Sequence, residues 1–253
     1  MTNTGRAGLV IAVDGPSGSG KSSAARGAAR ALGLRYLDTG AMYRAVTLWM
    51  LRHGVDVGDP AAVAASAQRP VIEIGTDPDE PEGPAVLLDD GDVTGPIRSR
   101  EVSNSVSAVS AVPEVRARLV AMQRSIIDGS VGDRGTVREA GSAGRGDGSS
   151  AGIVVEGRDI GTVVAPDAEV KVFLTASEST RAERRTRDLA ADPAATLTVT
   201  QQEMTRRDRL DSTRAASPLL KAADAVEIDS TQLGLDEVIA QIVALAQQRA
   251  VSA

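Results

Sequence analysis

The sequence predicts an α/β protein whose mostly parallel sheet is covered by helices. Short apolar runs, each the length of a buried strand, alternate along the chain with segments of helical periodicity. A glycine-rich loop joins the first apolar run to the first helical segment. The chain has 253 residues, which suits a single α/β domain that carries insertions.

Four apolar runs rich in valine or isoleucine are expected to form buried strands. They are Leu9–Asp14, Ile153–Glu156, Val170–Leu174 and Ala225–Asp229. Between the first two, the region from Pro70 to Pro96 holds two shorter apolar pieces, Val71–Ile74 and Val86–Leu88, separated by turn-forming residues. We expect a small antiparallel excursion there.

The first two helical segments are marked by their ends. Ser22–Leu32 is followed by Gly33, a residue typical of helix C-termini. Pro113 is placed to open a second helix, which runs to about Ile127. The apolar face of this helix is expected to comprise Val115, Leu119, Met122 and Ile126.

Two further helices are predicted in the C-terminal half. Thr200–Glu203 has the pattern of a capping box and is expected to open a helix that runs to about Leu210. The last helix has a buried stripe of Val238, Ile239, Ile242 and Val243. Before both, Gly129–Gly152 is rich in Gly, Ser, Arg and Asp, so we expect a flexible surface insertion.

Composition excludes several classes of protein. Apolar residues make up 42% and charged residues 25%, which is typical of a globular chain and excludes a wholly disordered one. Cysteine is absent, so disulfides and thiolate metal sites are excluded. The single histidine, His53, excludes multi-histidine metal sites and is expected to lie on the surface or cap a helix C-terminus.

Charge and hydropathy favour a soluble, cytoplasmic protein. The formal charge of −6 argues weakly against broad binding to nucleic acid or membranes. No apolar run is long enough to span a bilayer, and Met1–Gly8 lacks the apolar core of a signal peptide. Nothing in the sequence indicates an obligate dimer, so we expect a monomer.

The strongest functional signal is the phosphate-binding loop Gly15-Pro-Ser-Gly-Ser-Gly-Lys-Ser22, which lies between a predicted strand and a predicted helix. Its glycines let backbone N–H groups surround an anion, and the helix that follows directs its positive end at that anion. Lys21 supplies a cation, and the Ser22 hydroxyl is a ligand for Mg²⁺ that bridges phosphates. The sequence therefore predicts binding of a nucleoside triphosphate with Mg²⁺.

Other sequence features limit the functions for which the protein could use this triphosphate. The chain has two asparagines, Asn3 and Asn104, and neither precedes a lysine, so the guanine-reading motif of GTPases is missing. No apolar run ends in Asp-Glu, as a motor ATPase would require. A second, phosphate-bearing substrate needs its own arginines. The candidates are Arg44, Arg116, Arg158 and Arg214.

In its motifs, the sequence resembles bacterial cytidylate kinases from about Leu9 to Ala246. The phosphate loop alone would fit many enzymes, but several other runs are more specific. They are Leu37-Asp-Thr-Gly-Ala-Met-Tyr-Arg44, Glu101-Val-Ser-Asn104, Glu156-Gly-Arg-Asp-Ile-Gly-Thr-Val-Val164 and Asp211-Ser-Thr-Arg214. The insertion at Gly129–Gly152 departs from the family pattern.

The resemblance implies a nucleoside monophosphate kinase fold, with the chain as a single kinase domain over residues 8–247. A parallel core of five strands would include a short strand at Tyr36–Asp38. An insert that binds the monophosphate would span 60–112 and contain the small antiparallel sheet. A short lid would span 184–200, after a helix at Ser177–Leu189 whose arginines are Arg181, Arg184, Arg185 and Arg187.

The resemblance also implies roles for individual residues. ATP would be bound by Gly15, Pro16, Ser17, Gly18, Ser19, Gly20, Lys21, Ser22 and Ser23, and Mg²⁺ by Ser22. The acceptor would be bound by Thr39, Arg44, Ser107, Arg116, Arg158, Asp159, Asp211 and Arg214. Within this set, Arg44, Arg158 and Arg214 would hold its phosphate, Ser107, Arg116 and Asp159 would read cytosine, and Asp211 would accept from the ribose. Catalysis would rest on Lys21, Arg158 and Arg184.

The implied reaction is phosphoryl transfer from ATP to CMP, with dCMP as a further acceptor. Three alternatives stay open at this point: another small-molecule kinase that uses UMP or a different acceptor, a non-catalytic nucleotide-binding regulator, and an RNA-binding protein. The net negative charge and the aromatic content of 2% weaken the RNA-binding alternative.

Overall fold

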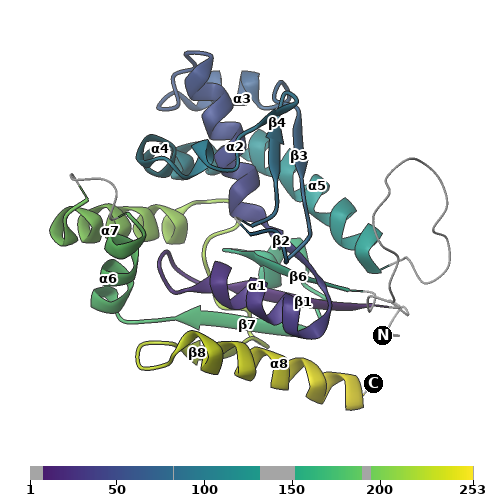
Figure 1. Ribbon diagram of the computed structural model, residues 1–253. Helices are drawn as coiled ribbons and strands as arrows, with labels where there is room; N and C mark the ends of the chain where they lie inside the picture. The colour runs from purple at the N-terminus through teal and green to yellow at the C-terminus, as the bar shows by residue number, and fades with distance from the viewer. Residues whose placement is uncertain (1–7, 82, 132–151, 190–194, 253) are drawn as a thin grey trace.

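The main sheet of the protein has five parallel strands in the order β2-β6-β1-β7-β8. The computed structural model describes residues 8–81, 83–131, 152–189 and 195–252 (Figure 1). The strands are β1 (Leu9–Asp14), β2 (Arg35–Asp38), β6 (Gly152–Gly157), β7 (Val170–Thr175) and β8 (Val226–Asp229). The predicted α/β class and all five predicted strands of the core are confirmed.

The register of these strands brings the sequence motifs together. Asp14, the last residue of β1, pairs with Gly157 of β6 and with Phe173 of β7. Asp38, the last residue of β2, pairs with Glu156 of β6. Parallel strands that end at the same level place the loops that follow them at one edge of the sheet. That edge therefore carries the phosphate loop and the segment that contains Arg158.

Helices cover both faces of the sheet because alternate strand residues point in opposite directions. On one face, Ile11 and Val13 pack with α1 (Lys21–Leu32) and α8 (Leu235–Ser252). On the other face, Val10 and Ala12 pack with α2 (Thr39–Arg52) and α5 (Pro113–Val131). Figure 1 shows α8 on the side of the sheet opposite α2 and α4.

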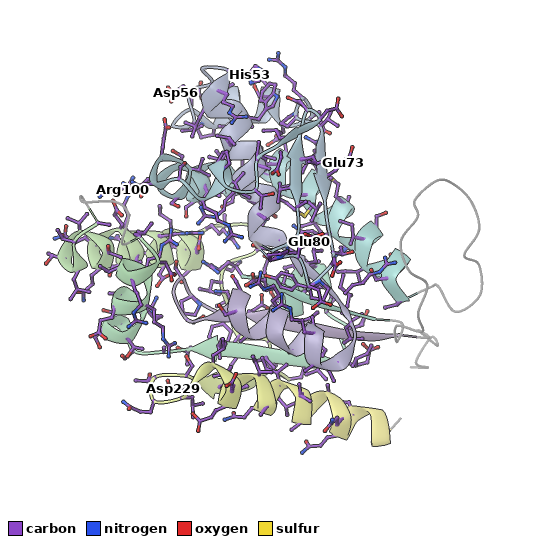
Figure 2. All side chains as sticks on the ribbon, viewed as in Figure 1. His53, Asp56, Glu73, Glu80, Arg100 and Asp229 are labelled. Atoms are coloured by element: carbon purple, nitrogen blue, oxygen red, sulfur yellow. The ribbon has the colours of Figure 1, made fainter. Side chains whose placement is uncertain are left out.

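A second, three-stranded antiparallel sheet lies beyond α2, as the sequence predicted for Pro70–Pro96 (Figure 1). Its strands are β3 (Ile72–Ile74), β4 (Val86–Leu88) and β5 (Gly91–Asp92). The helical elements around it are α3 (Pro60–Ser66), the short helix Pro96–Arg98 and α4 (Arg100–Ser110). His53 caps the C-terminus of α2 and lies at this end of the molecule, away from the main sheet (Figure 2).

Two helices stand beside the end of the main sheet, α6 (Glu178–Asp188) and α7 (Leu197–Thr213). The prediction that Thr200 opens α7 is wrong. The helix begins at Leu197, because the side chain of Thr196 accepts from the amide of Val199 and caps it, and Thr200 is buried within the first turns. The proposed lid, 184–200, therefore includes the last turn of α6 and the first of α7, and residues 190–194 within it lie outside the described part of the chain.

The predicted apolar face of α5 is only partly correct. Val115 and Leu119 are buried, but the face continues through Gln123 and Ile127, while Met122 and Ile126 are half-buried. Arg116 is also on the buried face. Polar residues therefore share this face with the apolar residues that predicted it. The helix runs to Val131, and most of the expected insertion, residues 132–151, lies outside the described residues.

Among the helices that the structure describes, none is both long and apolar enough to cross a membrane.

Truncation of Ile242 on α8 tests the packing of the α1–α8 face. Its side chain is fully buried, so Ile242→Ala is expected to lower the free energy of unfolding by about 2–5 kcal/mol through lost burial and cavity formation. Urea unfolding followed by circular dichroism measures this change. The control is Leu235→Ala at the start of the same helix, 49% exposed, which should cost less than about 1 kcal/mol. Equal losses for the two variants would contradict this view of the core.

Candidate active site

A cavity of about 670 Å³ opens at the carboxyl edge of the main sheet. We call it the main cavity. Its walls come from the phosphate loop, the start of α2, the end of β6, and helices α6 and α7. Its charged lining includes Lys21, Arg44, Arg158, Arg184 and Arg207, with Asp38 and Glu156 opposite in sign. Such a concentration of positive charge fits a ligand with several phosphates.

The phosphate loop has the geometry that its glycines predict. Gly15 has φ 151°, and a Cβ there would lie 2.0 Å from the carbonyl oxygen of Leu174, so only glycine allows the loop to turn against β7. Gly20 is left-handed at φ 89° and precedes α1, whose first residue is Lys21. The Lys21 Nζ donates to the carbonyl of Pro16 at 2.7 Å, which folds the lysine back over its own loop.

Burial and, next in size, the nearby charge of Arg158 lower the pKa of Lys21 to about 7, although Glu156 opposes the shift. The ammonium group therefore lacks full charge compensation from the protein. An anion bound in the loop would supply it.

Asp14 ties the phosphate loop to the segment that follows β6. Its carboxylate accepts from the amides of Ile160 and Gly161, each at 2.8 Å, where the chain forms a π-helical turn at Ile160–Val164. Burial raises the pKa of Asp14 to about 6, although these two amide bonds act to lower it. The bonds fix the strand ends of β1 and β6 relative to each other.

A buried network of charged side chains lies beside the main cavity; we call it the base-side cluster. Its members come from α4, α5, α7 and the segments after β6 and α7: Ser107, Arg116, Asp159, Asp211 and Arg214. Arg116 forms a close ion pair with Asp159, and its guanidinium carbon lies 5.4 Å from the ring centre of Tyr43. Arg214 lies 3.7 Å from Asp159 and 3.9 Å from Asp211. Ser107 Oγ donates to Asp211 at 3.2 Å.

Arg158 connects this cluster to the main cavity. It lines the cavity, and its Nε donates to Asp211 Oδ2 at 3.0 Å. Burial lowers the pKa of Arg158, but the charge and hydrogen bond of Asp211, together with the charges of Asp208 and Glu156, outweigh it, so the pKa lies above its ordinary value. Burial likewise raises the pKa of Asp211, but Arg158, Arg207 and Arg214 hold it below its usual range. Both groups are therefore charged across the neutral range.

The remaining predicted acceptor residues differ in where the structure places them. Arg44 lines the main cavity and donates to Ser103 Oγ at 2.8 Å and to the carbonyl of Ile97 at 3.1 Å. Burial lowers the pKa of Arg44, and the nearby Arg207 and Arg185 add to this effect. Thr39 does not line the cavity; its buried hydroxyl donates to the carbonyl of Glu156 at 2.7 Å.

The arginines of α6 have different contacts. Arg184 lines the main cavity and donates to the carbonyl and hydroxyl oxygens of Ser230 at 2.8 and 2.9 Å. Arg185 and Arg187 also line the cavity. Arg181 is directed instead at the backbone of the phosphate loop, where it donates to the carbonyl of Ser17. Figure 2 shows Arg100 near α7, and its Nη2 lies 2.7 Å from Glu203 Oε1 of that helix.

Sequence reasoning missed Arg207 as a site residue. It lines the main cavity from α7, burial lowers its pKa to about 10, and its Nε has no hydrogen-bond partner within the described residues. An unpartnered buried guanidinium donor fits an anionic ligand. Arg207 lies four residues before Asp211, so helical periodicity would have placed both on one face of α7.

The oxygen donors near Ser22 fit a magnesium ion. The cavity wall brings Ser22 together with Asp38 and Glu156, and hydroxyl and carboxylate oxygens are the ligands Mg²⁺ prefers. No group of three or more His, Asp or Glu side chains poised for a metal occurs in the described residues. Such a small set of protein ligands suits Mg²⁺, which keeps several waters and is held largely by substrate phosphates.

A sequence profile of the cytidylate kinase family matches residues 11–139 and 145–248 of this chain. The chain belongs to the cytidylate kinase family. It is 48% identical to the cytidylate kinase of Streptomyces griseus over 99% of this chain and 97% of that one. It is 51% identical to that of Nocardia farcinica over 92% and 91%, and 50% identical to that of Rhodococcus opacus over 95% and 96%. The protein is therefore a nucleoside monophosphate kinase, which is a transferase.

The profile leaves residues 140–144 of this cytidylate kinase unmatched. They fall inside Gly129–Gly152, the segment expected to depart from the family pattern.

The pKa of Asp14 predicts a pH dependence of stability. Its folded-state value, about 6, lies above the ordinary 3.8, so the folded protein binds more protons between these pH values. Its contribution to the free energy of unfolding is therefore present at low pH and is lost as pH rises through about 6, by up to about 3 kcal/mol.

Urea unfolding of the wild type and of Asp14→Asn between pH 4.5 and 7 isolates this contribution as a difference. The advantage of the wild type should shrink as pH rises. A difference that is constant, or that grows with pH, would contradict the assignment.

Proposed function

We propose a residue-level account of the reaction that this cytidylate kinase catalyses, the transfer of a phosphoryl group from ATP to CMP to give ADP and CDP. ATP binds in the main cavity against the phosphate loop, and CMP binds with its base in the base-side cluster. One observation carries this arrangement: Arg158 lines the cavity together with Lys21 and is ion-paired to Asp211 of the cluster. The two substrates would therefore meet at Arg158.

The donor site comprises Gly15–Ser23. The amides of the loop and the N-terminus of α1 surround the phosphates of ATP, and Lys21 turns from its own loop carbonyl toward the transferred phosphoryl group. Exchange of a carbonyl partner for an anionic one stabilises the charged ammonium, which burial otherwise disfavours.

Ser22 would hold Mg²⁺, with Asp38 and Glu156 in the same wall of the cavity. When bound, the ion neutralises charge on the phosphates of ATP.

The base-side cluster is suited to cytosine. Asp159 accepts from the exocyclic amino group, while Ser107 and Arg116 donate to ring acceptors. Uracil has a carbonyl in place of the amino group, so two acceptors would oppose each other at Asp159. Asp159 is buried and ion-paired to Arg116, which holds its carboxylate in place as an acceptor. This geometry supports a preference for CMP over UMP.

The phosphate of CMP would be held by Arg44, Arg158 and Arg214. Of these, Arg44 and Arg158 reach the main cavity, and Arg214 joins Asp159 to Asp211 behind them. Asp211 accepts from the ribose hydroxyls, and loss of one hydroxyl in dCMP leaves its bonds to Ser107 and Arg158, which supports dCMP as a second acceptor. Thr39 would act through Glu156, whose carbonyl it holds.

The chemistry needs little proton transfer. The attacking oxygen of CMP is already ionised, so a strong general base is unnecessary, and the rate comes from positioning and from charge neutralisation. Lys21 stabilises charge from the loop side, and Arg158 and Arg184 do so from the opposite walls of the cavity.

A coupled ADP-release assay with ATP and Mg²⁺ tests the substrate assignment, with CMP, dCMP, UMP, AMP and shikimate offered separately. We expect kcat/KM for CMP to exceed that for UMP by roughly 10- to 100-fold, the cost of one unsatisfied buried pair. AMP and shikimate should give no turnover. Equal efficiency with UMP would contradict base reading by Asp159.

Asp159→Asn tests the same contact from the protein side. It should lower kcat/KM for CMP more than for UMP, so the ratio between the two moves toward one. Asp90→Asn is the matched control, because this exposed residue lies in the turn between β4 and β5, at a positive φ that asparagine tolerates. It should leave both efficiencies within about twofold.

A further inference from the structure

Two charged residues outside the predicted site, Asp208 and Arg181, form hydrogen bonds with a single residue of the phosphate loop, Ser17. The amide of Ser17 donates to Asp208 Oδ1 of α7 at 3.1 Å, and its carbonyl accepts from Arg181 Nη1 of α6 at 3.0 Å. Arg181 is also ion-paired to Asp208, and its Nε donates to the carbonyl of Ala176 at 3.2 Å. Both backbone polar groups of a single residue, Ser17, are thus bound by the two members of one ion pair.

The contact is buried and closely packed. The side chains of Arg181 and Asp208 are 10% and 17% exposed. At the next residue, Gly18, a Cβ would lie 2.7 Å from Met204 Cε and 2.8 Å from the carbonyl oxygen of Arg181. Helices α6 and α7 therefore rest directly on the loop, and the loop takes its position from them.

Helix α7 also carries residues of the acceptor side. Asp211, three residues after Asp208, joins Ser107, Arg158 and Arg214, while Arg207 lines the main cavity. Successive turns of one rigid helix thus contact the donor loop and the acceptor cluster.

We propose that Asp208 and Arg181 are positioning residues that set the distance and angle between the bound donor and the bound acceptor. The inference rests on the proposed placement of ATP against the phosphate loop and of CMP against the base-side cluster. In-line phosphoryl transfer requires the reacting atoms to be aligned at close range, and a misplacement of about 1 Å can cost about 100-fold in rate. Removal of the contacts that Asp208 and Arg181 make with Ser17 should therefore slow transfer without abolishing the binding of either substrate.

The test compares Asp208→Ala, Asp208→Asn and Arg181→Met with the wild type. Asparagine keeps an acceptor for the Ser17 amide but loses the charge that pairs with Arg181, whereas alanine loses both. Asp224→Asn is the matched control, since it removes an aspartate paired to Lys171 at 2.8 Å on β7, away from the cavity. For each protein, kcat for CMP phosphorylation, the Kd of CMP alone, the Kd of ATP alone and the Tm are measured.

We expect Asp208→Ala and Arg181→Met to lower kcat by about 10- to 100-fold, with both Kd values within threefold of the wild type. Asp208→Asn should fall between alanine and wild type, and Asp224→Asn should keep the wild-type kcat. A kcat within twofold of the wild type in Asp208→Ala would overturn the proposal. So would a loss of kcat matched by an equal loss of either binding affinity, as a merely structural role predicts.

If the alanine variant does not fold, Asp208→Asn still tests the proposal. Its kcat should lie below that of the wild type while the Kd values of CMP and ATP stay within threefold. A wild type that does not turn over CMP at all would instead contradict the substrate assignment, so the two failures are distinct.

Discussion

The ion pair between Arg158 and Asp211 joins the two halves of the site. Arg158 directly follows β6 and lines the cavity, while Asp211 belongs to α7 and also accepts from Ser107. A buried charge without a partner is costly, so each of these residues keeps the other in place and charged. Helices α4 and α7 and the edge of the sheet are therefore linked through this pair, because Arg158 follows β6, Asp211 lies on α7, and Ser107 of α4 donates to Asp211.

Much of the fold follows from local sequence signals. The strand Leu9–Asp14 and the turn at Gly15 are set by neighbouring residues, and both could be predicted. The short strand at β2 came only from the likeness to a known family, because four residues carry too weak a pattern alone. The start of α7 was missed because Thr196 and Thr200 both suit an N-cap, and it is Thr196 whose side chain accepts from the amide of Val199.

Candidate site residues could be predicted from the sequence where they belong to contiguous motifs. They were harder to predict where the packing of helices brings distant residues together. The loop and the run from Glu156 to Val164 could be found in the sequence. Asp208 could not be assigned, because its contact with Ser17 depends on how α7 lies against the loop. Arg207 was missed although its spacing of four residues from Asp211 places both on one face of α7. The apolar face of α5 was misjudged for a related reason. Arg116 must reach Asp159, so a charged residue occupies a core position that hydrophobic periodicity cannot detect.

The most direct test of this account is a crystal structure of the protein with CMP and ADP bound. In this complex, cytosine is expected against Ser107, Arg116 and Asp159, and the ribose at Asp211. The CMP phosphate is expected at Arg158, where it faces the β-phosphate of ADP in the loop. Arg158 would then contact the acceptor phosphate from the position it holds beside Asp211. A structure with CMP bound elsewhere, or with the cluster in place and no contact between Arg158 and the phosphate, would contradict it.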